Sequence, residues 1–148
     1  MTTVVIFKSK DSYKGFTCTG HAEFAEAGKD IVCASISVLV INTLNAIEQF
    51  ANEKTDVVAK DGVIECRFLN DINDKTKLLM DTMLLGLKDI EKNYGKQNKK
   101  SFFRLTIEEL SWKIRDFLTG KFVPGHKFDS IKKGGNNNDE FRSSVFCS

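Results

Sequence analysis

An uncharged, mostly apolar run at residues 31–47 constrains the fold of this chain more than any other feature. It is shorter than the roughly 20 residues that a transmembrane helix needs, and it is interrupted by polar side chains. These are Ser35, Ser37, Asn42, Thr43 and Asn45. We therefore expect a helix from Ile31 to about Phe50 that is buried on most sides, as the central helix of a globular domain.

The chain has 148 residues, which is the size of one ordinary domain. Hydrophobic residues make up 41% and charged residues 28%, the balance of a globular protein in water. The net charge of +2 is too small to predict a nucleic-acid partner, and we expect no DNA partner. The charge is also uneven, because residues 110–148 hold 7 Lys and Arg against 4 Asp and Glu, while residues 1–109 hold 15 against 16.

The four cysteines stand at positions 18, 33, 66 and 147, without a CxxC pair, and His21 and His126 lie far apart. This pattern predicts neither a zinc site nor a disulfide framework. Free thiols fit a reducing compartment, and the N-terminus lacks the features of a secretory signal. We expect a cytoplasmic protein with no membrane association.

The first elements precede the apolar helix. Residues 4–7 and 15–19 have strand-like composition, and we expect a hairpin whose long turn spans the polar residues 8–14. Residues 20–29 lack alternation and hold a glycine near each end, so we expect a mobile loop hinged at Gly20 and Gly28. Asp30 stands where its carboxylate can cap the helix.

The second half repeats the strand–strand–helix order. Asp61-Gly62 predicts a tight turn between strands at 57–60 and 63–69, with Ile64, Cys66 and Phe68 facing the core and Glu65 and Arg67 facing water. Residues 72–94 have the apolar spacing of an amphipathic helix, and Gly95 is placed for a left-handed cap. A strand at 102–107 follows.

The predicted order is therefore β-β-α-β-β-α-β, an α+β domain of two layers: a small sheet packed with a buried central helix and an amphipathic second helix. We expect this domain to span residues 1–109. A short helix at 108–118 would join this domain to an extension, residues 110–148. In the extension we expect a flexible link at 132–140 and weak order beyond about residue 120.

Cys33 and His21 are the candidate catalytic pair. With Asp30 as the cap, Cys33 occupies the third helical position, where the helix dipole favours a thiolate. His21, on the glycine-hinged loop, can fold over this turn as a general base, and unpaired N–H groups there could bind an oxyanion. Asp30 either orients His21 or only caps the helix, and its negative charge opposes thiolate formation.

The spacing of Cys33 and His21 alone also permits non-catalytic roles for both residues. A cysteine in an apolar helix is more often an inert core residue, and a histidine on a loop is more often a surface residue. For Cys18, Cys66 and Cys147 we expect no chemistry.

Two motifs carry a family resemblance. Gly20-His21-Ala22 is followed by the segment Gly-Lys-Asp-Ile-Val-Cys-Ala at residues 28–34, which opens the long helix, and residues 78–95 supply a second similar helix. Together they closely resemble the ribosomal-processing cysteine protease (Prp) family over about residues 1–109.

The resemblance implies a small enzyme, usually a homodimer, that removes an aromatic-containing N-terminal extension from large-subunit ribosomal protein twenty-seven and so supports ribosome assembly. By motif, Cys33 is the nucleophile, His21 the general base and later acid, and Asp30 a supporting residue. The substrate-binding loop contains Gly20, Ala22 and Gly28. Neither a metal nor an organic cofactor is implied.

The chain departs from the family at Glu23 and Ala27, where many relatives carry Gly and an aromatic residue, and in residues 110–148, which have no counterpart. An alternative function is a non-catalytic ribosome- or RNA-associated module. It would use the basic extension and its interleaved aromatic residues. These are Trp112, Phe117, Phe122 and Phe128.

Overall fold

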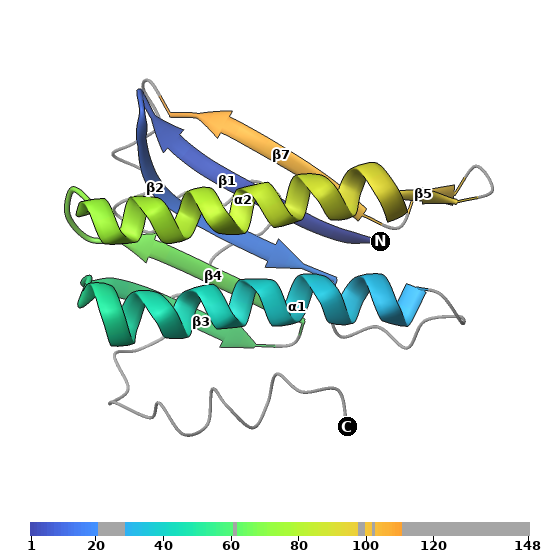
Figure 1. Cartoon of the computed structure of the whole chain (residues 1–148), viewed down its shortest axis with the longest axis horizontal. Coiled ribbons are helices and arrows are strands. Elements are labelled where there is room, and N and C mark those ends of the chain that lie inside the picture. Colours follow the sequence, from blue (N-terminus) through green and yellow to red (C-terminus); the bar gives the residue numbers. More distant parts are fainter. Residues whose placement is uncertain (21–28, 61, 98–99, 102, 111–148) are drawn as a thin grey trace.

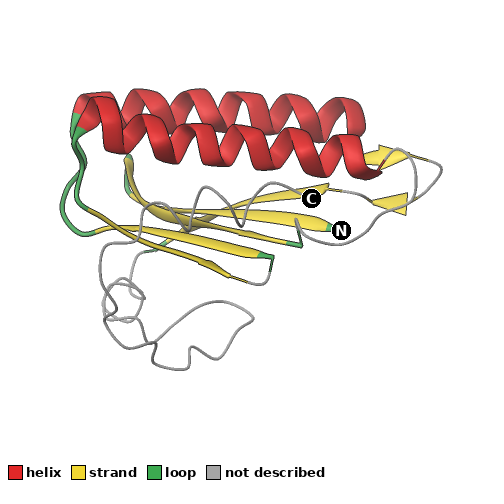
Figure 2. Ribbon diagram, turned by 90° about the horizontal axis from the view of Figure 1, so that it is seen from below, coloured by secondary structure: helices red, strands yellow, loops and turns green. Residues whose placement is uncertain are grey.

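The computed structural model describes residues 1–20, 29–60, 62–97, 100–101 and 103–110. A five-stranded sheet forms one layer, and two helices lie side by side on one of its faces as the other layer (Figures 1 and 2). The α+β, two-layer architecture predicted from the sequence is confirmed. The predicted order β-β-α-β-β-α-β is also present, with additional short elements.

The elements follow the chain as β1 (Thr2–Ser9), β2 (Ser12–Thr19), α1 (Lys29–Ala46), the π-helical turn η1 (Ile47–Ala51), β3 (Thr55–Lys60), β4 (Val63–Phe68), α2 (Asp74–Tyr94), β5 (Lys96–Gln97), β6 (Lys100–Ser101) and β7 (Phe103–Glu109). The sheet order is β3-β4-β2-β1-β7. β7 pairs in parallel with β1, and the other neighbouring strands of this sheet are antiparallel. β5 and β6 form a separate small hairpin that the sequence did not predict.

Alternate strand residues build the core between the sheet and the helices. Ile64, Cys66 and Phe68 of β4 are fully buried, as predicted. They pack with residues of the first hairpin and of both helices. These are Val4, Ile6, Tyr13, Phe16, Cys18, Val32, Ile36, Val40, Leu44, Ile47, Met80, Met83 and Leu87.

The other face of β4 contradicts the prediction. Glu65 and Arg67 were expected to face water, but they are only 4% and 7% exposed. Nε of Arg67 lies 2.9 Å from Oε1 of Glu65, so the two charges are buried as an ion pair. Strand alternation predicted correctly which face each residue occupies, but it does not show whether that face is covered.

The first hairpin turn is shorter than predicted. β1 and β2 extend to Ser9 and Ser12, which leaves Lys10 and Asp11 as the turn in place of residues 8–14. A bulge after Phe7 lets the polar ends of both strands continue pairing. The expectation was wrong because polar residues at a strand end were interpreted as a loop.

α1 is less buried than a central helix would be. The segment Ile31–Ala51 is long and apolar enough to cross a membrane by length and composition alone. In the fold it packs on the sheet with one side and on α2 with another. Its remaining side leaves Ile31 69% and Val38 59% exposed, because both helices cover the same face of the sheet.

The two helices approach closely at Gly86 of α2. A Cβ atom at this position would lie only 2.7 Å from Cδ2 of Leu39 on α1. The absence of a side chain at Gly86 therefore permits the observed packing distance.

α2 begins at a side-chain cap. Oδ1 of Asn73 accepts a hydrogen bond from the Thr76 N–H at 2.9 Å, and Oε2 of Glu53 accepts from the Asn73 N–H and from the Thr76 hydroxyl. At the other end, Gly95 has φ −62°, so the predicted left-handed cap is wrong. Its N–H instead continues the right-handed turn by donating to the carbonyl of Glu91 at 2.9 Å.

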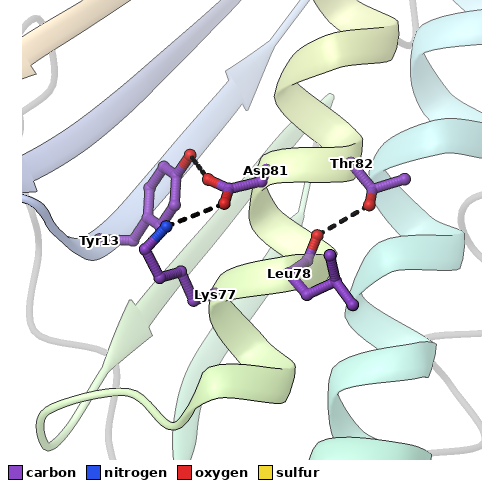
Figure 3. A network of polar contacts seen from close by, with 5 residues as sticks. All are labelled: Tyr13, Lys77, Leu78, Asp81 and Thr82. Atoms are coloured by element: carbon purple, nitrogen blue, oxygen red, sulfur yellow. Dashed lines mark hydrogen bonds and ion pairs between the residues drawn. The ribbon is translucent and has the colours of Figure 1, made fainter.

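A polar network fastens α2 to β2 (Figure 3). The Tyr13 hydroxyl donates to Oδ1 of Asp81, and Nζ of Lys77 lies 3.0 Å from Oδ2 of the same carboxylate. Nζ of Lys8 lies 4.7 Å from the centre of the Tyr13 ring, a cation–π contact. Burial, followed by the hydrogen bond to Asp81, raises the pKa of Tyr13 above its usual value.

β7 ends the described part of the fold. It extends to Glu109, so Glu108 and Glu109 are strand residues and the predicted helix at 108–118 is wrong at its start. The parallel pairing with β1 explains the difference, because it continues to the Lys8–Glu109 pair. The rest of that helix, the link at 132–140 and the order beyond residue 120 lie outside the described residues.

Candidate active site

Cys33 lies one turn inside the N-terminus of α1. The helix begins at Lys29, so Asp30 lies within its first turn and the predicted cap position is wrong. Cys33 is consequently the fifth helical residue, not the third. Side chains of a helix lean toward its N-terminus, so the Cys33 side chain still leans over the first turn, where the helix presents unpaired N–H groups.

The Cys33 residue is 8% exposed, on the part of α1 that packs near the end of β2. Cys18, on the inward face of β2, is fully buried. Burial, with a smaller contribution from the nearby Cys33, raises the pKa of Cys18 to about 12. The candidate nucleophile is therefore close to the last residues of β2, and the chain continues from there toward Gly20.

Gly20 is held firmly where the chain leaves β2. Its N–H donates to the Gly62 carbonyl at 3.0 Å, and its own carbonyl accepts from the Thr2 hydroxyl at 3.4 Å. Its φ of +82° is in the left-handed region, and a Cβ atom would lie 2.5 Å from the carbonyl oxygen of Met1. Only glycine fits this position. The expected hinge at Gly20 is thus a residue with fixed backbone geometry.

The two ends of the candidate loop are described, and its interior is not. The chain leaves β2 at Gly20 and re-enters regular structure at Lys29. His21, Ala22 and Gly28 lie outside the described residues, and of Asp30 only the backbone position is described. The His21–Cys33 pair therefore stays a prediction.

The other described thiols are core residues. Cys18 and Cys66 both occupy inward strand positions with no exposed surface. Burial, assisted by the charges of Asp56 and Glu65, also raises the pKa of the Cys66 thiol. Both residues are poor candidates for a nucleophile, because thiolate formation is disfavoured and solvent is excluded.

The described part of the chain offers no candidate metal site. There, no group of three or more His, Cys, Asp or Glu side chains is arranged to hold a metal ion. Within the same residues, Cys33 is the least buried thiol and the one that has a helix N-terminus beside it.

The contacts that fix Gly20 have no signature in the sequence. Thr2 belongs to β1 and Gly62 to the turn between β3 and β4, and no sequence motif links them to the loop. The one available signal was Gly20 itself, at the end of a strand and before a loop, which indicates a left-handed backbone.

Comparison with known proteins gives consistent matches. The family model described as "Cysteine protease Prp" matches residues 1–99. The ribosomal processing cysteine protease Prp of Staphylococcus aureus is 34% identical over 85 residues, which cover 56% of this chain and 80% of that protein. Its Bacillus subtilis counterpart is 33% identical over 85 residues, covering 53% and 76%.

Comparison with solved structures also gives matches to Prp proteases. The crystal structure of the essential ribosomal processing protease Prp from S. aureus, in complex with a substrate peptide, superposes with a TM-score of 0.65 at 31% identity. The match covers 73% of this chain and all of that one. A second S. aureus structure, with a covalently linked product peptide, has a TM-score of 0.63 at 32% identity.

Proposed function

Because the chain belongs to the cysteine protease Prp family, we propose that it removes the N-terminal extension of large-subunit ribosomal protein twenty-seven, with Cys33 as nucleophile and His21 as general base. The observation that carries this proposal is the family match, which includes both residues. The position of Cys33, near the first turn of α1 and less buried than Cys18 or Cys66, supports the assignment of the nucleophile.

The proposed chemistry proceeds in two stages. His21 takes the proton of the Cys33 thiol, and Sγ attacks the carbonyl carbon of the scissile peptide bond. The C–N bond then breaks as His21 returns this proton to the leaving amine, which leaves a thioester on Cys33. In the second stage His21 takes a proton from water, the hydroxide attacks the thioester, and the thiol of Cys33 is regenerated.

The helix N-terminus has a role in both stages. Each tetrahedral intermediate carries a negative charge on the former carbonyl oxygen. Unpaired backbone N–H groups in the first turn of α1 are suited to bind this oxyanion, as donors that require no rearrangement. Asp30, in the same turn, is proposed as a supporting residue, and Gly20, Ala22 and Gly28 as parts of the loop that holds the substrate.

The substrate class is supported by the relatives. Those named above are ribosomal processing proteases, and one was crystallised with a substrate peptide. We propose for this chain an aromatic-containing N-terminal extension as substrate, and a cytoplasmic location, where ribosomal proteins are assembled. We also propose a homodimer, which the outward-facing apolar side chains of Val38 and Leu85 would support.

The test is a cleavage assay with the full chain. It is incubated with ribosomal protein twenty-seven carrying its N-terminal extension, and the product is identified by mass spectrometry. Cys33→Ala and His21→Ala should abolish cleavage, whereas Cys147→Ala, which removes a different thiol, should cleave normally. Undiminished cleavage by Cys33→Ala would end the proposal. RNA binding without cleavage would instead favour the non-catalytic alternative.

A further inference from the structure

The sheet has a second face, opposite the two helices, which we call the outer face. It carries the strand residues that alternate with the core residues, among them Thr17 on β2 and Glu65 and Arg67 on β4. These three residues are 6%, 4% and 7% exposed. Both described helices lie on the other face (Figure 2), so the described elements do not account for this burial.

Neighbouring strands cannot bury these side chains by themselves. The cross-strand neighbours of Glu65 are Thr17 and Val58, and those of Arg67 are Gly15 and Asp56. They flank the ion pair but do not lie above it. On an uncovered antiparallel sheet, charged side chains at such positions face water. Burial also raises the pKa of Glu65, as expected for a carboxylate removed from solvent.

The chain itself leaves the described region on this face. Leu110 is 2% exposed and packs with Phe7 and Val5 in a small apolar cluster that is separate from the main core. Its N–H donates to the carbonyl of Lys8 at 2.7 Å. Val5 shares the outer face with Glu65, because both are cross-strand neighbours of Thr17.

The 38 residues after Leu110 have the length and composition to cover this face. β4 lies two strands from β1, about 10 Å at the usual strand spacing, which three or four extended residues can span. The segment is rich in large apolar side chains, and the family match ends before it, at residue 99. Its large apolar residues are Trp112, Ile114, Phe117, Leu118, Phe122, Val123, Phe128, Ile131, Phe141, Val145 and Phe146.

We propose that residues 111–148 pack across the outer face and cover the Glu65–Arg67 ion pair. The outer face is thus a docking surface for this chain's own C-terminal segment. The segment adds a third layer to the two-layer family fold. This placement differs from the weak order that the sequence analysis expects beyond about residue 120.

A thiol placed on the outer face tests the proposal in the full chain. In Thr17→Cys, the new thiol should react with iodoacetamide at least about tenfold more slowly than the thiol of Thr82→Cys, because position 82 is exposed on α2. Adding Phe117→Asp and Phe122→Asp should raise the Thr17→Cys rate by about tenfold or more. Cys66, on the inward face of β4, should stay unreactive and so report that the sheet remains folded.

Two results of this experiment would overturn the proposal. The first is that the thiols at positions 17 and 82 react with iodoacetamide at equal rates when residues 111–148 are unsubstituted. The other is unchanged protection of position 17 in the segment variant, which would assign the cover to another molecule. If protection is lost on dilution, that molecule is a second copy of the chain.

Carbodiimide cross-linking of the unsubstituted chain provides a test that does not depend on the variants folding. Asp56, an exposed residue on the outer face, should couple to lysines of residues 111–148 at least about tenfold more often than Asp89, which is exposed on α2. Mixing light and heavy chains distinguishes coupling within one chain from coupling between two. Equal coupling at Asp89, or coupling only between chains, would contradict the proposal.

Discussion

Tyr13 on β2 donates a hydrogen bond of 2.5 Å from its hydroxyl to Oδ1 of Asp81 on α2, which fastens the second helix to the sheet (Figure 3). Tyr13 is 1% exposed and its ring belongs to the main core. The bond therefore joins a buried residue to a partly exposed one, and its removal tests how much this attachment stabilises the fold.

Tyr13→Phe should lower the free energy of unfolding by about 1 kcal/mol, because it removes one hydrogen bond and keeps the buried ring. Urea denaturation measures the change. In a double-mutant cycle with Asp81→Asn, the two losses should be less than additive. Thr82→Ala is the control, since its hydroxyl donates to the Leu78 carbonyl of the same helix and so does not join α2 to the sheet. Fully additive losses would show that Tyr13 and Asp81 do not interact.

The Tyr13–Asp81 hydrogen bond also predicts that the stabilisation it provides depends on pH. The hydrogen bond from Tyr13, followed by that from Lys77, holds the pKa of Asp81 below its ordinary value of 3.8. A carboxyl with a lowered pKa stabilises the folded state above its unfolded-state pKa, and this contribution is lost as the pH falls through the folded-state pKa. The stability difference between the wild type and Tyr13→Phe should therefore shrink in strong acid. A difference that is the same at neutral and strongly acidic pH would contradict this prediction.

The inward residues of the sheet and the element order could be predicted because they depend on local alternation and helical spacing. Ile64, Cys66 and Phe68 illustrate this, since each alternates with a residue on the other face. Glu65 and Arg67 were predicted wrongly because local alternation does not report what covers a face. The side of α1 left open by the sheet and α2, with Ile31 and Val38, was missed for the same reason: it depends on tertiary packing.

The candidate site shows the same limit. Cys33 could be placed near a helix N-terminus from the sequence, because an apolar run after a polar loop marks a helix start. Asp30 itself lies inside the helix, which the structure describes from Lys29, and a sequence pattern does not decide a helix end to within one or two residues. The contacts that fix Gly20 involve Thr2 and Gly62, which are distant in sequence and meet only through strand pairing.

Gly20→Ala should destabilise the fold by about 2 kcal/mol or more, because it combines a left-handed backbone with a clash against the Met1 carbonyl oxygen. It should also slow cleavage by displacing the point where the candidate loop begins. Thermal unfolding and the cleavage assay measure the two effects. Gly86→Ala is the matched control: its new Cβ would meet only the flexible end of Leu39, and alanine favours a helix, so the loss should be smaller. Equal losses for both variants would refute the argument.

Cys33 should react with iodoacetamide faster than Cys18 or Cys66 in the folded chain. Burial raises the pKa of Cys18 to about 12 and raises that of Cys66 as well, whereas Cys33 is the least buried of the three, at 8% exposed against 0%, and lies beside a helix N-terminus. Peptide mapping by mass spectrometry resolves each thiol. In urea all three should react at similar rates, which provides the control. If Cys33 is alkylated no faster than Cys66 under native conditions, its assignment as an accessible nucleophile fails.

The buried ion pair predicts a marked asymmetry between single and double substitutions. Arg67→Met leaves the Glu65 carboxylate buried without this partner and should lower the free energy of unfolding by about 3–5 kcal/mol at neutral pH. Combining it with Glu65→Leu should restore most of the loss, because two apolar side chains need no hydration. Urea denaturation of the two single variants and the double variant provides the comparison.

The penalty of Arg67→Met should also depend on pH. Burial raises the pKa of Glu65 above its ordinary value of 4.5, while Arg67 lowers it, so removing Arg67 raises that pKa further. A carboxyl whose pKa is raised on folding costs no stability while it is protonated in both states. Its cost appears as the pH rises from the unfolded-state pKa through the folded-state pKa. The Arg67→Met penalty should therefore be small below pH 4.5 and grow toward neutral pH. A penalty that is independent of pH would mean that its origin is lost packing of the arginine side chain and not the uncompensated charge of Glu65.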